Sequence, residues 1–132
     1  MEDELINIDT GIIAKEKGFN IPCWNYWQSN IKGKWNNLTS GNPYDFNDDG
    51  ENYISQPIQA LLQRWLRETY NIFIVITPKR CYPDNEAVDQ HSWVIYFHDK
   101  IIDFDDGVYS YEKALEEALK HGLTLIKDKS ED

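Results

Sequence analysis

Long apolar runs are missing from this sequence of 132 residues. A membrane-spanning helix needs about 20 consecutive apolar residues, and no stretch here approaches that length. The first residues, Met1-Glu2-Asp3-Glu4, are acidic, whereas a secretory signal has basic residues followed by an apolar segment. We therefore expect no membrane partner and a location in the cytoplasm.

Cysteine is scarce, and the histidines follow no metal-binding spacing. Cys23 and Cys81 lie far apart and belong to no Cys-x-x-Cys pair, so we expect free thiols in a reducing cytoplasm and leave a disulfide open. His91, His98 and His121 lack the His-Glu-x-x-His pattern of zinc sites. Although the fold could bring a cysteine and a histidine together, we predict no catalytic residue, no metal and no cofactor.

Basic residues are also few, with 13 Lys and Arg against 23 Asp and Glu, which gives a net charge of −10. This charge repels duplex nucleic acid and anionic membranes and attracts a basic protein surface. The expected partner is therefore a basic protein and not a duplex. The simpler alternative is that the acidity only keeps the protein soluble.

Apolar residues are abundant enough for a packed core, since 41% of the chain is hydrophobic and 14% is aromatic. We predict a single domain over residues 1–132, with frayed acidic ends at 1–8 and 127–132. The predicted class is α+β, with a small antiparallel sheet of three to five strands and two main helices packed on one face.

The first half of the chain contains weak helix and strand signals. A short helix is predicted at Thr10–Lys17, with Asp9 or Thr10 as its cap and Gly18 at its end. Pro22 blocks helix continuation, so Cys23–Gln28 is expected to be extended. A second short strand is expected at residues 34–35. Residues 36–52 are rich in Asn, Asp, Gly and Ser and are predicted to form a long polar loop.

The second half has clearer periodicity. Apolar residues at helical spacing predict a helix over Gln56–Thr69, with Ser55 as its N-cap and Trp65 in its apolar face. Gly122 in the last helix is expected to mark a close packing contact or an early helix end. The other predicted elements are a buried strand at Ile72–Thr77, a polar connection at 79–90, a hairpin of Trp93–Phe97 and Ile101–Asp105, and a helix at Tyr111–Ile126 capped by Ser110.

Three stretches of the chain are distinctive as strings. They are AKEKGFNIPC at residues 14–23, SQPIQALLQRWLRE at 55–68 and SYEKALE at 110–116, which together make up about a quarter of the chain. In residues 54–76 and 109–126 above all, the chain resembles a family of small uncharacterised proteins encoded by phages and prophages of gut bacteria. The resemblance implies an origin on a mobile genetic element and a bacterial cytoplasm, and it implies no activity.

The segment from Asp45 to Gly50 matches the opening of a calcium-binding loop, with oxygen-bearing side chains at alternate positions and glycine at the sixth. Gln56 occupies the twelfth position, where such loops need a bidentate glutamate. Pro43 and its neighbours also exclude a helix before the loop. We interpret the segment as a polar turn and predict no calcium site.

Carboxylates gather around the predicted hairpin, where Asp103, Asp105 and Asp106 follow His98 and Asp99. Residues two apart on a strand point to the same side, so Asp103 and Asp105 could hold a divalent metal or act as acid and base. A solvated sheet face followed by a turn is the simpler interpretation, because the spacing fixes no nucleophile and no third ligand.

Large aromatic residues crowd the first third of the chain. In an extended segment Trp24 and Tyr26 share one face, and Trp27 lies on the other. One face can be core, so the second is a candidate binding surface unless loops or a helix cover it. Together with the acidic hairpin, this gives the candidate binding residues Trp24, Trp27, Trp35, Tyr44, Asp103, Asp105 and Asp106.

Two functions follow as hypotheses. The first is a non-enzymatic acidic accessory protein of phage or prophage origin that binds a host or phage protein. The alternative is a small-molecule-binding protein or small enzyme with a pocket lined by the acidic hairpin 98–106 and the N-terminal aromatic residues. A pocket with convergent carboxylates would favour the second hypothesis.

Overall fold

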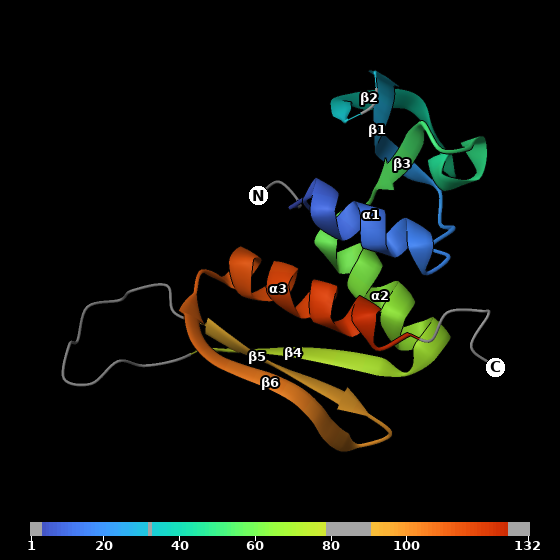
Figure 1. Ribbon diagram of the computed structural model, residues 1–132. Coiled ribbons are helices and arrows are strands. Elements are labelled where there is room, and N and C mark those ends of the chain that lie inside the picture. The colour runs from blue at the N-terminus through green and yellow to red at the C-terminus, as the bar shows by residue number, and fades with distance from the viewer. Residues whose placement is uncertain (1–3, 32, 79–90, 127–132) are drawn as a thin grey trace. The chain divides into compact units, whose positions relative to one another are not determined.

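A computed structural model describes residues 4–31, 33–78 and 91–126, and for residues 106–109 it describes the backbone alone. The α+β prediction is confirmed, since the described residues form three α-helices and two three-stranded antiparallel sheets (Figure 1). The chain divides into two compact units, one in residues 4–61 and one in residues 62–126. Each unit is described by itself. Residues 127–132 and the predicted connection at 79–90 lie outside the described residues.

The first unit contains one helix, one 3₁₀ turn and a sheet. Its sheet has the order β2-β1-β3, with both neighbouring pairs antiparallel. The elements are α1 (Ile8–Glu16), β1 (Cys23–Ile31), β2 (Lys34–Tyr44), η1 (Phe46–Asp49) and β3 (Tyr53–Gln56). Gly18 follows α1 with a φ of 93° and so ends the helix as predicted. The predicted cap is wrong, because α1 begins after Asn7.

The predicted fraying of residues 4–8 is wrong. Leu5 forms an antiparallel bridge with Ile58, and the side chain of Ile6 is buried. The Ile6 N–H donates to the Pro57 carbonyl at 3.2 Å, and the Gln59 N–H donates to the Glu4 carbonyl at 2.7 Å. This short pairing places the start of the chain beside the segment that leads into the next helix.

The predicted loop at 36–52 is also wrong over most of its length. Residues 36–44 belong to strand β2, in which every residue is exposed or half-buried. This strand has no apolar alternation because β1 satisfies its backbone while its side chains face water. Cys23 pairs with Tyr44 and Asn25 pairs with Thr39, so residues 40–43 form a bulge that accommodates the Gly-Asn-Pro sequence.

The helix that follows begins later than predicted. Ser55 and Gln56 lie in β3, and α2 (Gln59–Tyr70) starts after Pro57. Ser55 is no N-cap, because its hydroxyl accepts the Asn47 N–H at 3.2 Å and its own N–H donates to the Asn47 side-chain oxygen at 2.8 Å. Ser55 therefore hydrogen-bonds to Asn47 in η1 and lies in a strand, although its local propensity favours a helix N-cap.

The second unit is a sheet with two helices on one face. The order is β4-β5-β6, and its elements beyond α2 are β4 (Ile72–Pro78), β5 (His91–Phe97), β6 (Lys100–Tyr109) and α3 (Tyr111–Thr124). His98 and Asp99 both adopt left-handed φ values, of 49° and 65°, which makes the predicted hairpin connection a two-residue turn. The Ser110 hydroxyl accepts the Lys113 N–H and caps α3 as predicted.

The core of the second unit lies between this sheet and its helices. Trp93, Ile95 and Ile74 are buried on the sheet side, and Leu119 is buried on α3. A Cβ atom at Gly122 of α3 would lie 3.3 Å from the Leu66 side chain of α2 and 3.5 Å from that of Ile72. The predicted close contact at Gly122 is therefore confirmed.

Candidate functional site

A cavity of about 410 Å³ opens in the first unit beside the start of β1. Segments distant in sequence meet there, namely the N-terminal segment, β1, the bulge of β2 and the turn from β3 into α2. Most of its lining is apolar, with three prolines among ten residues. The lining residues are Leu5, Pro22, Cys23, Trp24, Asn25, Pro43, Gln56, Pro57, Ile58 and Leu61.

Trp24 supplies the aromatic ring of the lining, with 55% of its area open to solvent. It lies on β1 between Cys23, which is buried, and Asn25, which is half-buried. An indole that lines a cavity while remaining accessible can cover an apolar group that enters it. The predicted separation of faces on β1 thus leaves the Trp24 ring available for contact.

Gln56 forms part of the cavity wall, and both polar atoms of its side-chain amide are hydrogen-bonded. Its Oε1 accepts a hydrogen bond from the Asn37 amide at 2.6 Å, and its Nε2 donates to the Ile6 carbonyl at 3.0 Å. Because both polar ends are used, this 6% exposed side chain is fixed in place. The wall that it forms is rigid and links β2 and β3 to the N-terminal segment.

The Cys23 thiol in the lining is poorly suited to nucleophilic chemistry. Burial, and to a smaller extent the Asp45 carboxylate, raises the pKa of the Cys23 thiol to about 12. The thiol donates to the Ile21 carbonyl at 3.3 Å. Since the thiolate is the reactive species, Cys23 is a neutral, inert group at neutral pH. A Cys–His pair built on Cys23 therefore has no activated sulfur.

Carboxylates gather at Asp45 and in η1, and the Asp45 charge acts on Cys23 in the cavity lining. Burial and the neighbouring Asp48 carboxylate raise the pKa of Asp45, so these groups repel one another. The Tyr44 hydroxyl donates to Asp49 at 2.7 Å, and this hydrogen bond raises the pKa of Tyr44. Tyr44 itself is 45% exposed. The result is a negative surface with an accessible phenol ring.

The same segment is the one that resembles a calcium loop, and protein groups engage several of its atoms. The Asn47 side chain accepts from Ser55 and donates to the Phe19 carbonyl. The Lys15 ammonium of α1 donates to the carbonyls of Gly50 and Tyr53, the latter at 2.6 Å. The Lys15 ammonium also interacts with the Asp45 and Glu51 carboxylates, so a positive charge is already present beside this segment and opposes a bound cation.

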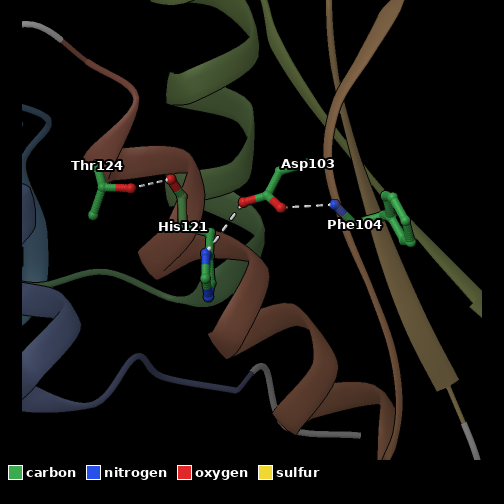
Figure 2. A network of polar contacts seen from close by, with 4 residues as sticks. All are labelled: Asp103, Phe104, His121 and Thr124. Atoms are coloured by element: carbon green, nitrogen blue, oxygen red, sulfur yellow. Dashed lines mark hydrogen bonds and ion pairs between the residues drawn. The ribbon is translucent and has the colours of Figure 1, made fainter.

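The predicted acidic hairpin lies in the second unit. Asp103 pairs across the sheet with Ile95, and Asp105 pairs with Trp93, so both carboxylates are on the helix-covered face. Figure 2 shows the Asp103 carboxylate pointing toward His121 of α3, with Oδ2 3.3 Å from Nδ1, while Oδ1 accepts the Phe104 N–H at 2.9 Å. The side chain of Asp106 lies outside the described residues.

The contact between His121 and Asp103 orients the imidazole ring, and the described groups around it form no metal site. The Thr124 hydroxyl donates to the His121 backbone carbonyl at 2.6 Å, and the His121 ring lies 4.8 Å from that of Trp93. Within the described residues, no three His, Cys, Asp or Glu side chains are placed to hold one metal ion. The contact ties β6 to α3.

The candidate residues therefore occupy different environments. Trp24 and Tyr44 are exposed, Trp35 is half-buried, and Trp27 is only 6% exposed and packs in the core. Trp24 lines the cavity of the first unit, and hairpin 98–106 belongs to the second unit. The sequence did not reveal the proline-rich wall. Pro22, Pro43 and Pro57 each indicate a turn, but their positions in the sequence do not show that they line one cavity. Nor did the sequence reveal the action of the Asp45 carboxylate on Cys23 in the cavity lining.

Comparisons with family models, with curated proteins and with solved structures find no match to this chain. Among the described helices, none is long and apolar enough to cross a membrane.

Proposed function

We propose that this chain is a non-enzymatic accessory protein of phage or prophage origin that binds a host or phage protein through the cavity beside Trp24. The observation that carries the proposal is an indole 55% exposed at an apolar cavity of about 410 Å³. Exposed aromatic residues at concave sites dominate many protein interfaces. The origin follows from the resemblance of residues 54–76 and 109–126.

The chemistry of the partner follows from the surroundings of the cavity. Pro43 lines it and is followed directly by Tyr44 and by the carboxylates of η1. The Asp45 charge acts on the Cys23 thiol in the lining, which places negative potential at the cavity itself. The fitting partner presents an apolar side chain flanked by Lys or Arg. Its basic residues speed the encounter, and its apolar residue holds the complex.

A capture experiment with matched tryptophan variants tests this proposal. Wild-type protein, Trp24→Ala and Trp35→Ala are immobilised and exposed to lysate of a bacterial host at low salt. Trp35 is the control, because it is an indole of the same unit that does not line the cavity. We expect one protein to be retained by wild type and Trp35→Ala and lost from Trp24→Ala. Equal retention by all three would show that the cavity is not the binding site.

A small molecule is a second candidate ligand, because the cavity volume falls in the range of small-molecule pockets, about 300–1,000 Å³. Asn25 supplies a half-buried amide in a mostly apolar wall. A metabolite that raises the melting temperature of wild type and of Trp35→Ala, but not of Asn25→Leu, would favour this function over protein binding.

A further inference from the structure

The outer face of the β4-β5-β6 sheet is apolar and has no described element of its unit upon it. Both α2 and α3 lie on the opposite face (Figure 1). A Cβ atom at Gly122 of α3 would there contact the side chains of Leu66, Ile72 and Ile74. The sheet register places the outward side chains together, since Phe73 pairs with Tyr96, Val75 with Val94, and Val94 with Phe104. Ile101 joins them through its pairing with Tyr96.

These outward side chains are unusually exposed for their type. Phe104 and Ile101 are each 59% exposed, Val75 is 44% exposed and Phe73 is 41% exposed. Val94 and Tyr96 on the central strand are half-buried between them. A contiguous apolar patch of this kind marks an interaction surface more often than chance exposure does.

From this face we propose that two copies of the chain associate through the outer faces of their β4-β5-β6 sheets. None of the six outward side chains that form the patch is charged. A charged partner would lose hydration there and meet no opposite charge. A second copy presents the same neutral surface, and a two-fold axis brings the two sheets together at the usual spacing of about 10 Å.

The area available sets the strength of this association. The exposed fractions of Phe73 and Phe104 sum to one whole phenylalanine, or roughly 200 Å². Val75 and Ile101 add on the order of 100 Å². A symmetric contact buries the face on both copies, so these four side chains supply about 600 Å², and the rim adds more. This total lies below the roughly 1,600 Å² of a standard interface, so the dimer is weak and reversible.

Net charge gives the association a distinctive salt dependence. Each copy carries a net charge of −10, so two copies repel each other at low ionic strength. Added salt screens this repulsion within about 10 Å at 0.1 M and strengthens the dimer. Added salt should instead weaken the binding of a basic partner at the cavity, because it screens an attraction. The dimer does not depend on the proposed function, because its face and the cavity lie in different units.

Sedimentation velocity of the full chain at increasing protein concentration tests the proposal. We expect the average mass to rise toward that of a dimer, and to rise further at high salt. Phe104→Ser, which removes a side chain 59% exposed, should weaken dimerisation by at least about tenfold. Phe97→Ser is the matched control, since Phe97 is 39% exposed but lies on the opposite face of β5 and pairs with Ile72.

Circular dichroism of each variant verifies that the fold is retained. A wild-type chain that stays monomeric at every concentration that its solubility allows overturns the proposal. An equal effect of Phe104→Ser and Phe97→Ser also overturns it. Growth beyond the dimer without a plateau overturns the face-to-face arrangement, because pairing of β4 in one copy with β6 in the next would produce open chains.

Discussion

Gly11 and Trp27 meet where α1 approaches the first sheet. A Cβ atom at Gly11 would lie 2.6 Å from a ring carbon of Trp27 and 3.2 Å from the Ile54 side chain. Trp27 is 6% exposed and has no room to move away. The glycine is therefore required by close approach of the helix and not by its backbone conformation.

Replacement of this glycine should destabilise the protein. We expect Gly11→Ala to lower the free energy of unfolding by about 1–3 kcal/mol through overpacking. Gly41→Ala is the control, because a Cβ there meets nothing within 4 Å, and its effect should stay within about 0.5 kcal/mol. Urea denaturation of both variants measures the difference. Equal stability of the two would show that α1 does not approach Trp27 so closely.

The Cys23 thiol should resist alkylation while the protein is folded. Its pKa is about 12, against 9.0 for an unperturbed thiol, because the group is buried. In a Cys81→Ser background, iodoacetamide at pH 8.5 should label unfolded protein and leave folded protein unmodified. Rapid labelling of the folded chain would contradict the burial of Cys23.

Cys23 should also lower the free energy of unfolding in strongly alkaline solution. The unfolded chain loses the Cys23 proton near pH 9, whereas the folded chain keeps it up to about pH 12. The folded state therefore binds more protons in this window, and the contribution of Cys23 to stability is lost as pH rises from 9 to 12. Cys23→Ala should flatten the decline in melting temperature across that window, relative to the parent protein.

At the scale of elements, α2 is the helix whose apolar face the sequence defines most clearly. Leu62 and Leu66 are fully buried and Trp65 is 6% exposed, with its ring 5.3 Å from that of Tyr70. We expect Trp65→Ala to reduce stability by about 3–5 kcal/mol, as large-to-small changes in a core do. A thermal melt that this substitution leaves unchanged would contradict the assignment of the helix face.

The η1 element should not bind calcium with useful affinity. Asn47 is engaged by Ser55 and Phe19, and the Lys15 ammonium contacts the Gly50 carbonyl. We expect calorimetric titration to detect no calcium binding tighter than about 10⁻⁴ M, the weak end of loop sites. Tighter binding that Asp45→Ala abolishes would refute the prediction.

For the whole molecule, the net charge of −10 should govern association with a basic partner. We expect the association rate to fall steeply with added salt, because screening shortens the attraction between opposite charges. Asp48→Asn together with Asp49→Asn should slow association, as should neutralising Asp105. Trp24→Ala should instead speed dissociation. Stopped-flow kinetics separates the two rates, and an association rate independent of salt would exclude electrostatic steering.

Elements with their own periodicity could be predicted from the sequence alone. The apolar stripe of α2, the strand at β4 and the Ser110 cap of α3 depend on residues close together in the chain. The β5–β6 hairpin also follows from local alternation around His98 and Asp99. Trp24 could be named as a candidate binding residue for the same reason, since an extended segment fixes which side chains share a face.

Long-range pairing decided the rest. Residues 36–44 form a strand because β1 offers hydrogen-bonding partners, which no local pattern in that polar segment reveals. The cavity exists because Pro22, Pro43 and Pro57 are brought together from three separate segments. Asp103 faces a helix because the register of β6 shifts by a bulge between Ile95 and Tyr96. Local sequence determines which elements form, whereas contacts between distant segments determine which side chains meet.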